Sequence, residues 1–519
     1  MNGADAGVQS HAGAAHTLRG EAAGLTGVRQ LSVRLLLALA FLGVYLPPLL
    51  RSLWIDEAGM FWMARGGPVA AIQKTLHWPG QSLLYAAITS LFCFEGSPLR
   101  DILLRLPALL GAAAAGYILY RFANDAIGPG AGRIAAILFA FSPTTIEFAT
   151  QARPYACAMA AAAASCWTLY RWAQSRERRW LSSYVVSLTL VFYFHYMFAV
   201  ILAAHAALLG WEMLRNRRWT RAADLIVAYI AVALLVLPLV PHLLLLFHQS
   251  HTLSFAHKPS LADLTELLLP PVFITGIFIT GILAHTLYPE RAWKGAAWRP
   301  GVVAMMIAWW CVGPLLAFAV SNATSSEIFV PRYISYSALG LALLLASVGY
   351  SAFGPKLGFA WVLAGTLLTT GNPLHIATIR NLGAAELRPA MRIIQNESAG
   401  QSSLPPVISR SDLTESDFLD WRAGNAPDSY LFAAYAAYPM KNTLVPLPFR
   451  LTNPVKDHVE QLIDHSLKNE NKIIFVTSDP SWIPWFDEQF ENAGFTSRWV
   501  KPNLYSVGVF ERKPGAAGK

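Results

Sequence analysis

The amino-acid sequence predicts a polytopic α-helical membrane protein with a small α/β domain at its C-terminal end. Of the 519 residues, 55% are hydrophobic and only 14% are charged, whereas about a quarter of the residues of a soluble protein are charged. Apolar runs of spanning length recur from residue 31 to about residue 374, and the chain is more polar beyond them. We therefore expect a disordered cytoplasmic tail (1–30), a membrane domain (31–374) and a soluble domain (375–519).

The apolar runs predict about eleven transmembrane helices. Residues 81–94 are too short for a span and better suit a helix at the membrane interface, within a first external loop of residues 51–105. Residues 181–214 are too long for one crossing and are bracketed by basic clusters, so we expect them to cross twice. The expected spans are roughly 31–50, 106–120, 133–148, 154–170, 181–195, 197–212, 223–245, 263–288, 301–320, 333–351 and 357–374.

The distribution of Lys and Arg gives an orientation and argues against nucleic acid as a partner. The net charge is +9, but the basic residues gather in short clusters between apolar runs, which is typical of membrane topology. With the spans above, seventeen of them lie in cytoplasmic segments and eight in external loops. The prediction is therefore that the N-terminus lies in the cytoplasm and the C-terminal domain on the external side of the membrane.

Polar residues gather at one set of helix ends, all on the predicted external side, whereas the middles of the spans carry almost no charge. Ion-coupled carriers usually place ionisable groups near the middle of the bilayer. The pattern indicates a site at one membrane face. Its candidate residues are Asp56, Glu57, Lys74, His77, Glu147, Arg153, Tyr155, His195, Tyr196 and Arg332.

The stretch SLWIDEAGMFW (52–62) places two carboxylates among aromatic side chains. Partial desolvation at the membrane edge would raise the basicity of Asp56, which suits a general base. Glu57 would then serve in positioning or charge balance. In the alternative interpretation both residues cap a helix at the membrane surface and pair with Arg51 or Arg65.

Several blocks in order resemble the bacterial branch of the GT-C glycosyltransferases, the polyprenyl-phosphate-sugar-dependent enzymes related to protein mannosyltransferases and to the aminoarabinose transferase of lipid A. The blocks are SLWIDEA (52–58), His77 leading into an apolar segment, LLRLPALLGAAAAGYILYRFA (103–123), GRIAAILFAFSPTTIEFATQARPYA (132–156), FHYMF (194–198) and VPRYI (330–334). The resemblance implies the GT-C fold, a polyprenyl-phosphate-linked sugar as donor, and Asp56 as the catalytic base.

Arginine suits the phosphate of such a donor, because its planar fork matches phosphate oxygens. Arg153 and Arg332 lie at external helix ends next to prolines, although either could instead contact lipid headgroups. Lys74 and His77 are further candidates for substrate binding. Tyr155, Tyr196 and Tyr333 could donate hydrogen bonds to phosphate or sugar, or could belong to the interfacial aromatic belt. His195, in a predicted tight external turn, could have a role in the site or a structural role.

No metal or other cofactor is required by this prediction, because arginines can neutralise the phosphate. A divalent ion between Asp56 and the phosphate stays open. The four cysteines lie in apolar segments without metal-type spacing. No glycine-rich phosphate loop or soluble DxD motif is present.

One block departs from the family pattern. The family commonly has Pro-Pro-Leu-Tyr after the first-loop histidine, whereas this chain has His77-Trp78-Pro79 followed by Gly80-Gln81-Ser82 before Leu83-Leu84-Tyr85. The insertion leaves the sugar and acceptor preference of this chain open.

The C-terminal region predicts a small α/β domain. LPPVISRSD (404–412), NKIIFV (471–476), SRWVKP (497–502) and LYSVGVFERK (504–513) indicate strands, and a helix should start near Pro480 and end at Gly494. We expect this domain to cover the site, to contact an acceptor, or to act only as structural support.

The sequence thus predicts an inverting membrane glycosyltransferase. It would pass a sugar from a polyprenyl-phosphate donor to a hydroxyl of a glycolipid, polysaccharide or protein at the periplasmic face. The alternative is a non-enzymatic transporter or flippase of lipid-linked glycans, which would need polar residues along a path through the bilayer.

Overall fold

The computed structural model describes residues 35–78, 80–216, 222–248, 258–269, 272–287, 290, 299–324, 327–371, 386–417, 430 and 433–514. The predicted tail, residues 1–30, lies outside them. Within the described residues, five helices are long and apolar enough to cross a membrane: Arg100–Ala126, Tyr196–Leu214, Ala222–His248, Pro300–Ala323 and Ser337–Thr369. Shorter apolar helices cover Leu35–Leu49 and Ala131–Ala140. The chain is therefore a helical membrane protein, and the finer count of eleven spans stays a prediction.

Most helices of the membrane region follow the predicted apolar runs. They are α2 (Ile55–Ala64), α3 (Gly67–His77), α4 (Leu83–Ser90), α5 (Arg100–Ala126), α6 (Ala131–Ala140), α7 (Pro143–Ala149), α8 (Tyr155–Ser175), α9 (Arg178–Phe194), η1 (Tyr196–Ile201), α10 (Leu202–Asn216), α11 (Ala222–Val236), η3 (Leu237–Leu239), α12 (Val240–His248), α13 (Leu261–Leu268), α14 (Val272–Leu287), α15 (Pro300–Ala323), η6 (Pro331–Tyr333) and α16 (Ser337–Gly371).

Prolines and glycines divide several of the apolar runs. The run 133–148 is split into α6 and α7 before Pro143, which begins α7. The two last predicted spans meet inside α16 at Gly354, whose φ of 71° is outside the helical region, followed by Pro355. Helix α4 is only 8 residues long, too short to cross a bilayer.

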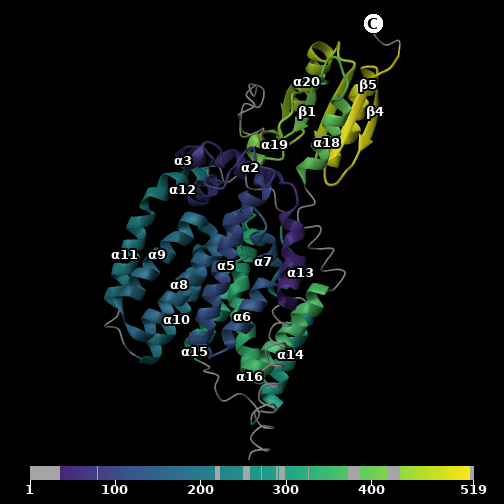
Figure 1. The fold of residues 1–519 in the computed structure, drawn as a ribbon. Coiled ribbons are helices and arrows are strands. Elements are labelled where there is room, and N and C mark those ends of the chain that lie inside the picture. The colour runs from purple at the N-terminus through teal and green to yellow at the C-terminus, as the bar shows by residue number, and fades with distance from the viewer. Residues whose placement is uncertain are drawn as a thin grey trace, which may run out of the picture. The chain divides into compact units, whose positions relative to one another are not determined.

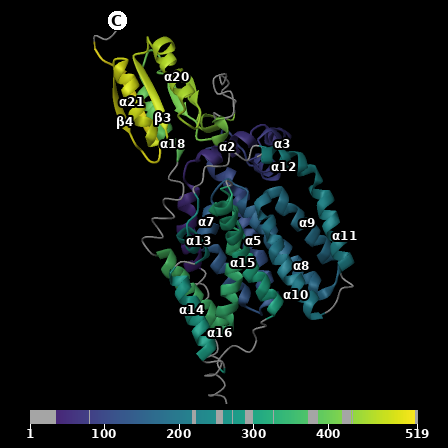
Figure 2. The same ribbon diagram turned by 180° about the vertical axis from the view of Figure 1, so that it is seen from behind.

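Small residues allow the central helices to approach closely. Helix α8 packs against α5 and α9, and α8 and α9 lie side by side in both views (Figures 1 and 2). A Cβ added to Gly111 of α5 would lie 2.8 Å from the backbone nitrogen of Cys157 in α8. A Cβ added to Gly340 of α16 would lie 2.8 Å from the backbone nitrogen of Trp310 in α15. Such close backbone contacts are typical of packed membrane helices.

The C-terminal region forms a mixed five-stranded sheet with helices on it. The strands are β1 (Val407–Arg410), β2 (Leu444–Leu447), β3 (Lys472–Thr477), β4 (Phe495–Val500) and β5 (Ser506–Arg512), in the order β2-β1-β3-β5-β4. β1 is parallel to β2 and β3, and β5 is antiparallel to β3 and β4. The helices are α18 (Leu387–Ser398), η7 (Thr414–Asp417), α19 (Ala433–Ala437), α20 (Asn453–Gln461), a π-helical turn (Leu462–Ser466), η11 (Pro480–Trp482) and α21 (Ile483–Asn492).

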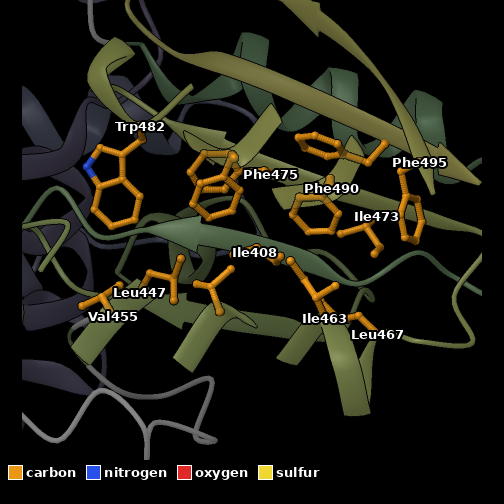
Figure 3. Close-up of a cluster of buried hydrophobic side chains, with 13 residues drawn as sticks. Ile408, Leu447, Val455, Ile463, Leu467, Ile473, Phe475, Trp482, Phe490 and Phe495 are labelled. Carbon is orange, nitrogen blue, oxygen red and sulfur yellow. The ribbon is translucent and has the colours of Figure 1, made fainter. Parts of the chain in front are cut away.

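One core cluster holds α20 and α21 on the sheet. Alternate strand residues such as Ile473 and Phe475 of β3 point into it, and Phe486 of α21 stacks on Phe475 with ring centroids 3.7 Å apart. Figure 3 shows Phe475, Phe490 and Trp482 along this layer. The expected strands near 407, 472, 497 and 506 are confirmed, as is the helix end before Gly494.

Polar contacts join the C-terminal domain to the first loop of the membrane region. Tyr438 accepts a hydrogen bond from the Leu53 backbone nitrogen at 2.7 Å and donates one to Asp101 at 2.8 Å. Asp101 also pairs with Arg388 at 2.6 Å and with Arg100 at 2.7 Å. Helix α19 packs on α2. The two regions therefore share an interface that adjoins the segment carrying Asp56.

Candidate active site

Three segments that are far apart in the sequence bring Asp56, Arg153 and Arg332 together. Asp56 lies in the first turn of α2. Its Oδ2 atom is 3.2 Å from Nη1 of Arg332 and 3.6 Å from Nη2 of Arg153. The Asp56 side chain is 20% exposed, so water and a substrate can still reach it. The structure thus brings together the three side chains of the predicted composite site.

Arg153 is the most buried of the three, with 7% of its surface exposed. It stands between α7 and α8, where Pro154 caps the start of α8. Its Nη1 atom donates to Oε1 of Gln81 at 3.1 Å, and its Nη2 atom donates to the Tyr155 hydroxyl at 3.3 Å. Its Nε atom is buried without a hydrogen-bond partner. Burial lowers the pKa of Arg153, but Tyr155 and Asp56 outweigh it and raise that pKa above its ordinary value, so the guanidinium stays charged.

Arg332 belongs to the short helix η6, and aromatic rings pack beside it. Its guanidinium carbon lies 5.5 Å from the centroid of the Tyr333 ring. The His195 ring lies 5.5 Å from that of Tyr333 and 5.1 Å from that of Tyr155. The Nδ1 atom of His195 is buried and has no hydrogen-bond partner. His195 and Tyr155 therefore lie beside the two arginines.

Glu57 is next to Asp56 in sequence but points into a buried ion pair. Its two carboxylate oxygens accept hydrogen bonds from Nε and Nη2 of Arg105, each at 2.7 Å. The side chains are 1% and 2% exposed. The Ala152 backbone nitrogen also donates to Glu57, at 2.8 Å. These contacts bind Glu57 to Arg105 and to the backbone. The geometry therefore suits the positioning role that the sequence suggested for Glu57.

Arg105 holds the chain just before α2 in place. Its remaining N–H groups donate to the carbonyl oxygens of Leu49 at 2.9 Å, Arg51 at 2.8 Å and Ser52 at 3.1 Å. This buried arginine was not among the predicted site residues. Its position in the LLRLPA block, a single charge in an apolar run, was the signal for it.

Three of the predicted binding residues make other contacts. Lys74 donates to the carbonyl oxygens of Trp62 at 2.7 Å and Arg65 at 3.0 Å, at the end of α2. His77 bonds the backbone of its own helix, at the Gln73 oxygen 2.8 Å away. The Tyr196 hydroxyl bonds His242, whose other ring nitrogen reaches the Thr75 oxygen. None of these contacts joins the three residues to Asp56.

Two residues that sequence reasoning did not select lie at the site. Gln81, from the Gly-Gln-Ser insertion, bonds Arg153 as described above, and its Nε2 atom donates to the Tyr430 hydroxyl at 3.0 Å. The departure from the family pattern was a signal for Gln81. Tyr430 comes from the C-terminal region, where no sequence pattern marked it.

A cavity of about 890 Å³ opens beside Arg332. Pro331 and Ser335, on either side of Arg332, line it, and so does Glu147 of α7. Apolar residues of α13, α14, α15 and α16 form much of the remaining wall: Leu267, Leu269, Ile279, Trp310, Ala338 and Leu341. A largely apolar groove thus adjoins the segment that carries Arg332.

Among the described residues, no group of three or more His, Cys, Asp or Glu side chains is placed to hold a metal ion. A bridging ion between Asp56 and a phosphate would use a single protein carboxylate. That the reaction requires no metal ion therefore stays a prediction.

Comparisons with known proteins agree with the resemblance. Residues 77–244 match the family described as "Dolichyl-phosphate-mannose-protein mannosyltransferase". That range includes Gln81, Arg153 and His195 but not Asp56 or Arg332. None of the curated proteins compared with the chain matches it.

Two solved structures are similar in fold over most of the chain. ArnT from Cupriavidus metallidurans bound to undecaprenyl phosphate is 12% identical, with a TM-score of 0.53 over 94% of this chain and 99% of that one. The oligosaccharyltransferase AglB from Archaeoglobus fulgidus, in complex with an inhibitory peptide and a dolichol-phosphate, is 11% identical, with a TM-score of 0.50 over 94% and 75% of the two chains. The expected resemblance is confirmed for the fold, and residues 77–244 also match the mannosyltransferase family.

Proposed function

We propose that this chain is a membrane glycosyltransferase of the GT-C type, which transfers a sugar from a polyprenyl-phosphate donor to an acceptor hydroxyl with Asp56 as the general base. The match of residues 77–244 to the mannosyltransferase family and the fold shared with ArnT support the proposal. The observation that carries the proposal is the convergence of Asp56 with Arg153 and Arg332. A carboxylate and two guanidinium groups within 4 Å supply both a proton acceptor and a phosphate site.

The proposed reaction is a single inverting displacement. The acceptor oxygen attacks C1 of the sugar while the bond from C1 to the phosphate oxygen breaks. Asp56 takes the hydroxyl proton, and the electron pair leaves with the polyprenyl phosphate. A positioned base typically contributes about 10²–10⁴ in rate.

The two arginines neutralise the leaving phosphate in this proposal. Arginine binds phosphate oxygens through charge-assisted hydrogen bonds. The unpartnered Nε atom of Arg153 is one donor that a phosphate oxygen would satisfy, and the Nδ1 position of His195 is a second polar atom without a partner nearby. A phosphate would also draw the arginines away from Asp56, which frees the carboxylate to accept a proton.

The remaining predicted residues take different roles. Tyr155 and His195 lie beside the arginines and would contact the phosphate or the sugar. Glu57 positions the loop through Arg105. Lys74, His77 and Tyr196 would support the first loop, because their contacts are to backbone groups and to His242.

The groove beside Arg332 offers room for part of the polyprenyl chain. Much of its wall is apolar, and Pro331, which precedes Arg332 in the sequence, lines it. Undecaprenyl phosphate is bound in the ArnT structure and dolichol-phosphate in the AglB structure. We propose that the present chain binds a lipid phosphate of this class.

We further propose that the reaction takes place at the periplasmic face of a bacterial inner membrane. The support is the Lys and Arg count of the loops. The acceptor class is a glycolipid, a polysaccharide or a protein. No metal is required by the proposal, since the arginines carry the charge compensation.

A vesicle assay tests the proposed function. Purified protein is reconstituted with a polyprenyl-phosphate sugar, and the release of free polyprenyl phosphate is measured together with incorporation of the sugar into envelope extracts. Consumption of the donor, lost in Asp56→Asn, is the expected result. Movement of the intact donor across the bilayer without its consumption would instead identify the flippase alternative.

A further inference from the structure

The side chain of Gln81 joins the proposed phosphate site to the C-terminal domain. Its carbonyl oxygen accepts a hydrogen bond from Arg153 at 3.1 Å, and its amide nitrogen donates to the Tyr430 hydroxyl at 3.0 Å. Gln81 is 8% exposed and Tyr430 is 2% exposed. Both bonds are therefore buried away from water. A buried hydrogen bond is stronger than one at the protein surface.

Tyr430 is fixed by rings as well as by this hydrogen bond. Its ring lies 4.5 Å from that of Trp78, at 32°, and 5.5 Å from that of Trp62, edge to face. A Cβ added to Gly59 of α2 would lie 3.0 Å from the Tyr430 hydroxyl oxygen. Residues of α2 and of the segment after α3 thus enclose Tyr430 and determine where its hydroxyl group lies.

We propose that Gln81 and Tyr430 are positioning residues which hold Arg153 ready for the donor phosphate, so that the C-terminal domain contributes directly to donor binding. The proposal rests on the proposed function above. It assigns a role to the domain and to the insertion that separates this chain from the family pattern.

The chemistry of the amide explains why a glutamine suits this position. An amide is neutral, so it orients the guanidinium without cancelling the positive charge that the phosphate needs. Tyr430 accepts from the NH₂ end of the amide, and this bond keeps the carbonyl end turned toward Arg153. Without the Tyr430 hydroxyl the amide could rotate, presenting N–H groups to a guanidinium that can only donate. Arg153 would then turn toward Asp56, its nearest remaining acceptor.

The test is the affinity of the full-length protein for undecaprenyl phosphate without a sugar, measured in detergent micelles for four variants. Tyr430→Phe removes only the hydroxyl and keeps the ring against Trp78. Gln81→Ala removes both hydrogen bonds. Each should weaken binding about three- to tenfold, as expected for a lost buried hydrogen bond. The double variant should be no weaker than Gln81→Ala alone, because both residues act through one chain of bonds.

Tyr438→Phe is the matched control, since it also removes a hydroxyl at the interface with the first loop but bonds Leu53 and Asp101 instead. It should bind like the wild type. Equal affinity in Tyr430→Phe and wild type, equal losses in Tyr430→Phe and Tyr438→Phe, or additive losses in the double variant would each overturn the proposal. A wild-type protein that binds no undecaprenyl phosphate would overturn the proposed function itself, and the positioning role with it.

Discussion

Replacing Asp56 by asparagine should have opposite effects on turnover and on binding of the donor phosphate. Asparagine keeps the size of the side chain but cannot take a proton from the acceptor hydroxyl. Turnover should therefore fall by about 10²–10⁴. Asp56→Asn also removes the carboxylate that pairs with Arg153 at 3.6 Å and Arg332 at 3.2 Å, so both guanidinium groups become available to the phosphate.

The expected change in phosphate affinity follows from how exposed Asp56 and its two arginine partners are. The Asp56 side chain is 20% exposed and the arginines are 8% and 23% exposed, so solvent screens much of the attraction. A partly exposed ion pair contributes about 1 kcal/mol or less, which is roughly fivefold in affinity. Undecaprenyl phosphate should therefore bind Asp56→Asn as tightly as the wild type, or up to about fivefold more tightly.

The assay combines donor consumption in vesicles with equilibrium binding of undecaprenyl phosphate in micelles. Asp101→Asn is the matched control, because Asp101 also pairs with two arginines but contacts the C-terminal domain instead of the site. Its turnover should stay within a few-fold of the wild type. Full turnover of Asp56→Asn would refute Asp56 as the base. Markedly weaker phosphate binding would show that Asp56 holds the donor, as it would through a bridging divalent ion.

Three further outcomes follow from the geometry. Glu57→Gln should destabilise the fold by about 3–5 kcal/mol, because it leaves its buried arginine partner without a counter-charge; an unchanged midpoint of thermal unfolding would contradict this. Arg332→Lys keeps the charge but loses the planar fork, so the KM for the donor should rise by roughly tenfold in a steady-state assay; an unchanged KM would place Arg332 outside the phosphate site. Burial raises the pKa of Glu397, but hydrogen bonds from Lys472 and Arg498 outweigh it and lower that pKa, so this residue stabilises the C-terminal domain above about pH 4.5 and ceases to do so as the pH falls through its folded pKa. Hydrogen exchange of the full chain should show that Glu397→Gln loosens the domain at pH 7 and makes its exchange depend less on acid pH. The same pH dependence in the variant and the wild type would contradict this stabilising role of Glu397.

The convergence of Asp56, Arg153 and Arg332 could be predicted because topology and motif order constrain it. Arg153 and Arg332 each follow a helix end beside a proline, and the predicted topology places both ends on the membrane face that carries Asp56. The sequence could not show that Asp56 and Glu57 make different contacts. Successive helix residues point about 100° apart, so one carboxylate of α2 reaches the arginines while its neighbour is buried against Arg105.

The contacts of Tyr430 were beyond prediction for a different reason. Tyr430 and Gln81 are 349 positions apart, and their bond depends on how the C-terminal region meets the first loop. No periodicity around residue 430 marks a site. The Gly-Gln-Ser insertion did mark Gln81 as unusual, but a departure from a pattern says where to look and not what the residue contacts.

In the C-terminal domain, the strand that escaped prediction is β2. Its sequence, LVPL, contains Pro446, and a proline argues against a strand because it cannot donate to the ladder. The sheet order places β2 at an edge, where one side of the strand has no neighbour and a proline is tolerated. The other four strands contain no proline, and β3, β4 and β5 are also longer than β2.

The contacts of Glu57 have a consequence for how the enzyme could accommodate substrates of different size. Glu57 adjoins Asp56, and the backbone nitrogen that it accepts from belongs to Ala152, which adjoins Arg153. Through Glu57, the segments of Asp56, the proposed base, and of Arg153 are therefore clamped to one another as one half of the proposed site. Arg332 comes from a three-residue helix outside this clamp, next to the groove. We expect the distance between the two halves to open and close through the Arg332 segment alone, which makes that segment the place where engineering for a bulkier sugar should begin.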